Sequence, residues 1–97
     1  MVIMRFKVKV RPEQAEEVRA ALAEVIEPSR ALEGVVRLDI ASDLLDPHAF
    51  IATEVYEDEA ALERQEALPE VEAALALIRE CTVEREATLY RVASTEV

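Results

Sequence analysis

The first ten residues alternate between apolar and other side chains with a period of two, a pattern that predicts a β-strand. One face of this strand is entirely apolar, with Val2, Met4, Phe6, Val8 and Val10. The opposite face carries Ile3 and then the basic residues Arg5, Lys7 and Lys9. Because such an apolar face must be buried against another layer, the chain is constrained to a sheet packed on further secondary structure.

A helix is predicted directly after this strand. Pro12 suits a first helical turn, and the acidic Glu13 suits the positive end of a helix. Pro28 is predicted to end the helix, because proline interrupts helical hydrogen bonding. Between the two prolines, apolar residues recur three and four positions apart, at Ala15, Val18, Leu22, Val25 and Ile26.

Two further strands are predicted on either side of a short loop over residues 43–47. Gly34, the only glycine, precedes the second strand, where a turn needs backbone freedom. That strand places Val36, Leu38 and Ile40 opposite Val35, Arg37, Asp39 and Ala41. The third strand, residues 49–57, places Phe50, Ala52, Glu54 and Tyr56 opposite Ile51, Thr53 and Val55.

The C-terminal part is predicted to form two helices and a last strand. Asp58 is a suitable N-cap for a helix over residues 59–67, and Pro69 begins a second helix. The apolar side of that second helix comprises Val71, Ala74, Leu75 and Ile78. The last strand, residues 82–93, places Ala87, Leu89, Arg91 and Ala93 opposite Glu86, Thr88, Tyr90 and Val92.

The resulting order, β-α-β-β-α-β, predicts an α+β fold of the ferredoxin-like type with an antiparallel four-stranded sheet. No linker or repeat divides residues 1–97, which we expect to form one domain. Helices would cover one face of the sheet and leave the other uncovered. A second copy of the same sheet is the simplest cover, so we expect a homodimer.

Charge and composition exclude several classes of protein. The net charge is −10, which disfavours nucleic acid as a partner. The charged N-terminal strand is neither a signal peptide nor a membrane span, so we expect a cytoplasmic protein. The single Cys81 excludes an internal disulfide and a multi-cysteine metal site. We expect no metal site, because the single His48 has no cysteine nearby, although Asp43, Asp46 and His48 could bind a stray cation weakly.

The third predicted strand and the residues around it carry a family resemblance. Residues 46–62 contain, in order, Pro47, Phe50, the Glu-x-aromatic segment from Glu54 to Tyr56, the acidic residues 57–59 and the pair Ala61-Leu62, which opens a helix. Residues 33–38 and 68–71 are similar to the family's second strand and second helix pair. In this pattern the chain resembles the antibiotic biosynthesis monooxygenase family over nearly its whole length.

The resemblance implies a dimeric α/β barrel with a pocket between sheet and helices in each subunit. The family includes cofactor-independent monooxygenases of quinols and polyketide aromatics, haem-degrading enzymes and a sugar isomerase. The pocket's usual aromatic and histidine correspond here to Tyr56 and Gln65, and Gln65 cannot serve as a base. Ala52 occupies a position that is Asn in some oxygenases. The Asn and Trp of the haem-degrading subgroup are absent, so the resemblance disfavours haem degradation.

Glu54 and Tyr56 are the candidate catalytic residues, with Gln65, Ala52 and His48 as candidate substrate-binding residues. An acid inside an apolar strand must be paired or neutralised, so Glu54 is either a general base or the partner of an arginine. Arg37, Arg91 and an arginine of a partner chain are the candidates for that ion pair. Tyr56 either donates a hydrogen bond to a ligand or packs at the strand end.

Two functions remain open at this point. One is a monooxygenase-like enzyme that acts on a small aromatic or quinol-type substrate without a cofactor, its electrons coming from the substrate. The other is a non-catalytic dimeric module that binds a small hydrophobic ligand or regulates another protein. Gln65 in place of histidine favours the second function, whereas a strand glutamate beside a tyrosine favours the first.

Overall fold

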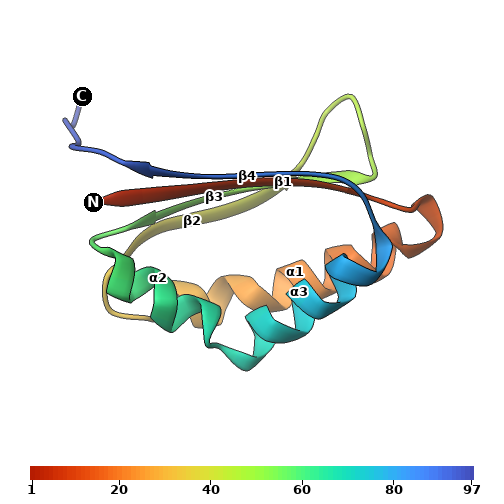
Figure 1. The fold of residues 1–97 in the computed structure, drawn as a ribbon, viewed down its shortest axis with the longest axis horizontal. Coiled ribbons are helices and arrows are strands. Elements are labelled where there is room, and N and C mark those ends of the chain that lie inside the picture. Colours follow the sequence, from red (N-terminus) through yellow and green to blue (C-terminus); the bar gives the residue numbers. More distant parts are fainter.

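A computed structural model describes residues 1–97 and confirms the predicted α+β, ferredoxin-like fold (Figure 1). A short 3-10 turn, Pro12–Gln14, precedes the first α-helix. The elements are β1 (Val2–Val10), α1 (Ala15–Arg30), β2 (Val35–Ser42), β3 (Ala49–Tyr56), α2 (Glu59–Glu66), α3 (Pro69–Cys81) and β4 (Thr82–Arg91). The third and fourth strands are thus slightly shorter than predicted, and α2 ends one residue earlier.

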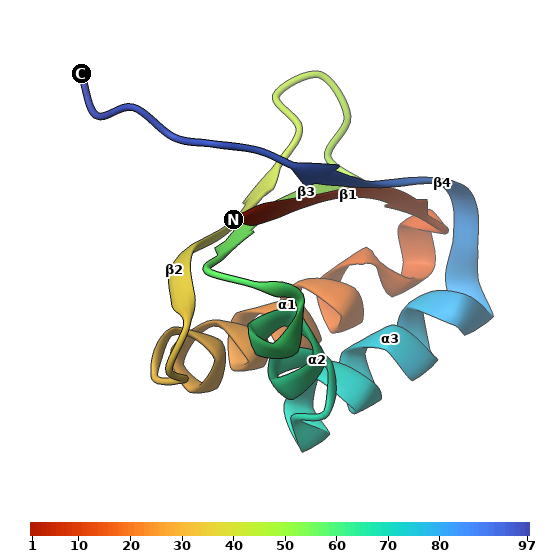
Figure 2. The same ribbon diagram turned by 60° about the vertical axis from the view of Figure 1, so that its left-hand side comes forward.

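The four strands form one antiparallel sheet in the order β2-β3-β1-β4. All three helices lie against the same face of this sheet, as Figures 1 and 2 show. The central strand β1 pairs with β3 on one side and β4 on the other, so that Phe6 lies opposite both Ala52 and Ala87. This register places the predicted apolar face of β1 toward the helices.

The hydrophobic core has two parts. The larger part joins Val8 and Val10 of β1 and Phe50 of β3 to the buried stripes of α1 and α3. The smaller part surrounds the fully buried Tyr56 and includes Val2, Ala61 and Leu62. The predicted apolar sides of α1 and α3 are therefore confirmed, and Asp58 caps α2 as predicted by accepting a hydrogen bond from the Ala61 amide.

The prediction that Pro28 ends the first helix is wrong. α1 continues through Pro28 to Arg30, and the Ala31 amide bonds to the Glu27 carbonyl. Pro28 lacks an amide donor and crowds the Glu24 carbonyl, but contacts of the next two residues hold the last turn in place. Ser29 is fully buried, and Arg30 donates to the Leu38 carbonyl and pairs with Asp39.

The second strand begins with a β-bulge that the sequence pattern did not predict. The pairing of β2 with β3 shifts register between Val35 and Arg37, so that Val35 lies opposite the inward-facing Tyr56. Val35 therefore packs on the helix side, and Val36 is exposed. A bulge inserts an extra residue and reverses the facing of the residues before it.

Gly34 makes the turn into β2 with a φ of +88°, as its backbone freedom predicts. Its carbonyl accepts a hydrogen bond from the Glu57 amide at 2.8 Å. A Cβ atom at this position would lie 2.7 Å from the Cβ of Ala61 in α2. The absent side chain thus lets the start of α2 lie directly against this turn.

The sheet face away from the helices has no covering layer in the single chain (Figure 2). The loop between β2 and β3 rises on this side (Figure 2), and its residues Leu44 and Leu45 are fully exposed. Ion pairs from β1 hold the loop, with Lys7 bonded to Asp43 at 2.9 Å and Lys9 to Asp46 at 3.1 Å. None of the helices has the length and apolar composition of a membrane span.

Candidate functional site

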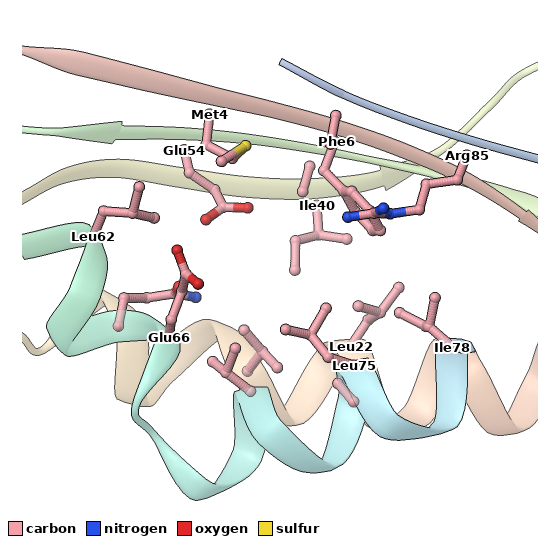
Figure 3. Close-up of a pocket in the computed structure, with 16 residues that line it drawn as sticks. Met4, Phe6, Leu22, Ile40, Glu54, Leu62, Glu66, Leu75, Ile78 and Arg85 are labelled. Carbon is pink, nitrogen blue, oxygen red and sulfur yellow. The ribbon is translucent and has the colours of Figure 1, made fainter. Parts of the chain in front are cut away.

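A cavity of about 150 Å³ lies between the sheet and the helices (Figure 3). Most of its wall is apolar, with Met4 and Phe6 above, Leu22 and Val25 of α1 below, and α3 completing the floor. The remaining lining residues are Ile40, Ala52, Glu54, Leu62, Gln65, Glu66, Val71, Ala74, Leu75, Ile78, Arg85 and Ala87. The space is suited to a small apolar ligand.

Small side chains on neighbouring strands create this space. Phe6 lies between Ala52 and Ala87, so no large residue fills the sheet surface on either side of its ring. At the edge strand β4, Ala87 and Arg85 face the helices but remain exposed. Glu66 at the end of α2 is also exposed, so these three residues mark the open side of the cavity.

Glu54 and Tyr56 lie two residues apart on the helix-facing side of β3 and bond directly to each other. The Tyr56 hydroxyl donates to Glu54 Oε1 at 2.5 Å. Glu54 lines the cavity, whereas Tyr56 is fully buried behind it and does not. The hydroxyl is therefore bonded to Glu54 rather than directed at the cavity.

The predicted ion pair between Glu54 and Arg37 or Arg91 is wrong. Arg37 pairs with Val55 in the sheet and lies on the opposite face from Glu54. Arg91 instead forms an ion pair with Glu59 at the start of α2. The Glu54 carboxyl thus has a tyrosine donor and no arginine within its own chain.

Burial raises the pKa of Glu54, and the negative charge of Glu66 raises it further, while the hydrogen bond from Tyr56 acts in the opposite direction. Figure 3 shows the carboxyl groups of Glu54 and Glu66 pointing toward each other. Burial and the Glu54 charge also raise the pKa of Tyr56 far above its ordinary value, so Tyr56 remains a donor. Glu54 therefore holds its proton to a higher pH than an ordinary carboxyl group does, because its pKa is raised.

The other predicted site residues fall into two places. Gln65 and Ala52 both line the cavity. The buried Gln65 amide donates to the hydroxyl of Ser29 at 3.1 Å, which fixes its orientation across the end of α1. His48 lies apart, half-buried in the β2–β3 loop, where its carbonyl accepts from the Val10 amide.

Glu66 and Arg85 line the cavity but were not predicted from the sequence. Each could have been found from periodicity alone. Glu66 follows Leu62 by four positions on α2, which places both on one helix face. Arg85 precedes Ala87 by two positions on β4 and so shares its face of the sheet.

No group of three or more His, Cys, Asp or Glu side chains is arranged to hold a metal ion. Asp43 and Asp46 of the β2–β3 loop are instead bonded to lysines of β1. The hydrogen bond from Lys7 lowers the pKa of Asp43, and the His48 amide with Lys9 lowers that of Asp46. These carboxylates are satisfied within the chain.

Comparison with known proteins gives one consistent result. The family model described as antibiotic biosynthesis monooxygenase matches residues 1–77. The proposed monooxygenase YcnE of Bacillus subtilis (strain 168) is 31% identical over 62 residues, which span 64% of this chain and 65% of that relative. This chain therefore aligns with less than two thirds of the relative's length.

Solved structures show the same fold. An antibiotic biosynthesis monooxygenase of known crystal structure superimposes with a TM-score of 0.86 at 22% identity, covering 97% of this chain and 100% of that one. PA3566 from Pseudomonas aeruginosa gives a TM-score of 0.83 at 26% identity and covers 95% of this chain and 94% of its own. The likeness at such low identity establishes the fold.

Proposed function

The chain belongs to the antibiotic biosynthesis monooxygenase family, and from this premise we propose that it oxidises a small aromatic or quinol-type substrate in its cavity without a bound cofactor. The observation that carries the proposal is Glu54, a carboxyl group of raised pKa in the wall of an apolar cavity. A base works best when its pKa lies near the operating pH. Burial moves Glu54 in that direction.

The proposed reaction uses Glu54 to take the phenolic proton of a hydroquinone. The phenolate then passes one electron to dioxygen, and the two radicals combine through a new bond between oxygen and a ring carbon. Loss of the ring proton and cleavage of the O–O bond give a hydroxyquinone and water. One oxygen atom enters the ring and the other leaves as water, so the substrate supplies all the electrons that reduce dioxygen.

Tyr56 and Gln65 have supporting roles in this proposal. The Tyr56 hydroxyl donates to Glu54 Oε1 at 2.5 Å and thereby fixes the orientation of the Glu54 carboxyl group toward the cavity. Gln65 offers a neutral amide to a ligand oxygen from a position fixed by Ser29. Ala52 leaves room for the ring beneath Phe6.

Oxygen consumption with a panel of hydroquinones and anthrones tests the proposal. Glu54→Gln should lower turnover by about 10²–10⁴-fold, the usual contribution of a general base. Tyr56→Phe should cost less, because it removes a positioning bond rather than the base. Glu57→Gln, which changes an exposed glutamate beyond the end of β3, is the matched control and should turn over as the parent does. No oxygen uptake by the parent protein on any substrate would refute the enzymatic proposal.

We also propose that the functional unit is a homodimer formed through the uncovered sheet face. Half-buried Ile3, Ile51 and Val55 lie on that face, and Tyr90 of β4 is exposed beside them. The exposed Leu44 and Leu45 stand above it on the β2–β3 loop. Burying these groups against a second copy would remove them from water, which is the main driving force for association.

The alternative is a non-catalytic dimeric module that binds a small hydrophobic ligand. It is favoured by Gln65, which cannot titrate and is already bonded to Ser29, and by Tyr56, which is bonded to Glu54. Binding of aromatic ligands without oxygen uptake would support this alternative. Loss of the dimer in Glu54→Gln would instead make Glu54 a structural residue.

A further inference from the structure

We propose that Arg85 selects substrates with a carboxylate on the ring, so that the preferred ligand is a single-ring hydroxylated aromatic acid. This inference rests on the proposed function only in placing the ligand in the same cavity. Arg85 is the one basic residue among those that line it. Its role would be recognition at the cavity mouth, away from the proton-accepting end.

The position of Arg85 follows from strand register. Arg85 lies opposite Val8, whose side chain is buried on the helix side, so Arg85 points to that side as well. Its guanidinium lies over the Phe6 ring, 5.6 Å from the ring centroid. Figure 3 shows this group beside Phe6, over the end of the cavity that lies away from Glu54.

The guanidinium of Arg85 has no anionic partner within the chain. Arg5 of β1 and Arg91 of β4 form ion pairs with Glu86 and Glu59, but no ion pair or hydrogen bond holds Arg85. The chain has 21 acidic and 11 basic residues, so carboxylates are plentiful. An inward-facing arginine left free in so acidic a chain is available to an anionic ligand.

The enclosed volume of the cavity accommodates one ring. An apolar cavity of about 150 Å³ accommodates benzene in another protein, and this cavity has about the same volume. Larger ring systems would have to extend through the open side past Glu66 and Arg85.

Charge then fixes how such a ring lies. Glu54 is opposite Met4 and Arg85 is opposite Val8 on the same strand, four residues or about 13 Å of main chain apart. A carboxylate near Glu54 and Glu66 would be repelled, whereas near Arg85 it is attracted. The ring hydroxyl is therefore directed to Glu54 and the carboxylate to Arg85.

Ligand binding followed by NMR titration at neutral pH tests this inference without any need for turnover. The probes are para-hydroxybenzoate and its neutral analogue para-hydroxybenzamide. The parent should bind the acid at least about fivefold more tightly than the amide, a difference in affinity between those expected for an exposed ion pair and for a hydrogen bond to a charged group. The preference should weaken as salt is added.

Two variants separate Arg85 from general charge effects. Arg85→Met keeps an apolar stem over Phe6 and should lose the preference for the acid. Arg79→Met removes another exposed arginine, from α3 and outside the cavity lining, and should keep the preference for the acid. Equal binding of acid and amide by the parent, binding of neither, or an unchanged preference in Arg85→Met would overturn the inference. Absence of oxygen uptake with the preference intact would count against the enzymatic proposal alone.

Discussion

Replacing Gly34 with alanine is expected to damage both the fold and the cavity, because two separate costs meet at this residue. The φ of +88° lies in a region that L-residues avoid. The added methyl group would also lie 2.7 Å from the Cβ of Ala61. Because Ala61 belongs to α2, relief of the clash requires movement of the helix that carries Gln65 and Glu66.

The size of the effect follows from these two terms. The left-handed backbone costs alanine about 1–2 kcal/mol. Overpacking against a buried methyl group costs about 1–3 kcal/mol more. The sum, about 2–5 kcal/mol, is a large share of the roughly 5–15 kcal/mol that stabilises a typical domain. Gly34→Ala should therefore unfold at clearly lower urea concentration than the parent.

A double-mutant cycle separates the two terms. Ala61→Gly removes the methyl group that the new side chain would meet, so Gly34→Ala in that background should cost only the backbone term. Ala60→Gly is the matched control, since it makes the same change at the adjacent, exposed position of α2. Urea unfolding followed by circular dichroism at one fixed protein concentration measures all the variants, because a dimer's stability depends on concentration. A cost below about 1 kcal/mol for Gly34→Ala, which is less than the backbone term alone, or an equal cost in both backgrounds, would refute the reasoning.

Three further outcomes follow from the charges and the uncovered face. Glu66→Gln should lower the pKa of Glu54, as measured by carboxyl-carbon NMR, because it removes a repelling charge; an unchanged pKa would show that burial acts alone. Since burial raises the folded-state pKa of Glu54 above the ordinary value of 4.5, the folded state binds more protons than the unfolded state between these values. In paired urea titrations, the stability of the parent should therefore fall relative to that of Glu54→Gln as the pH rises from 4.5 through the raised pKa of Glu54. Parallel curves of stability against pH for the two proteins would contradict this. Light scattering after size exclusion should give twice the chain mass of 10.9 kDa. A Leu44→Ser/Leu45→Ser variant should dissociate more readily than the parent. A monomeric parent at micromolar concentration would exclude the proposed homodimer.

The fold was predictable because local pattern and tertiary packing agree along most of this chain. The alternation in β1 and the helical stripes of α1 and α3 each bury the face that the sequence predicts. Prediction failed where tertiary contacts override local preference. Pro28 remains helical because Arg30 bonds to the β2 backbone and Ser29 is buried. The bulge at Val36 lets Val35 pack beside Tyr56, which alternation alone does not reveal.

The site was harder to predict because its polar residues come together from elements distant in sequence. Glu54 and Tyr56 were predicted to share a face of one strand, but their hydrogen bond and the absence of an arginine partner depend on rotamers and on the neighbouring strands. Glu66 was missed because an acid at a helix end is usually solvated, and it matters only because α2 ends against β3. The register of β4 places Arg85 over Phe6, and that contact holds a cationic side chain at the end of the cavity away from Glu54. A charged residue on an otherwise apolar strand face is therefore the most informative feature of such a sequence. The apolar residues of that face shape the cavity, and the charged residues among them supply its chemistry.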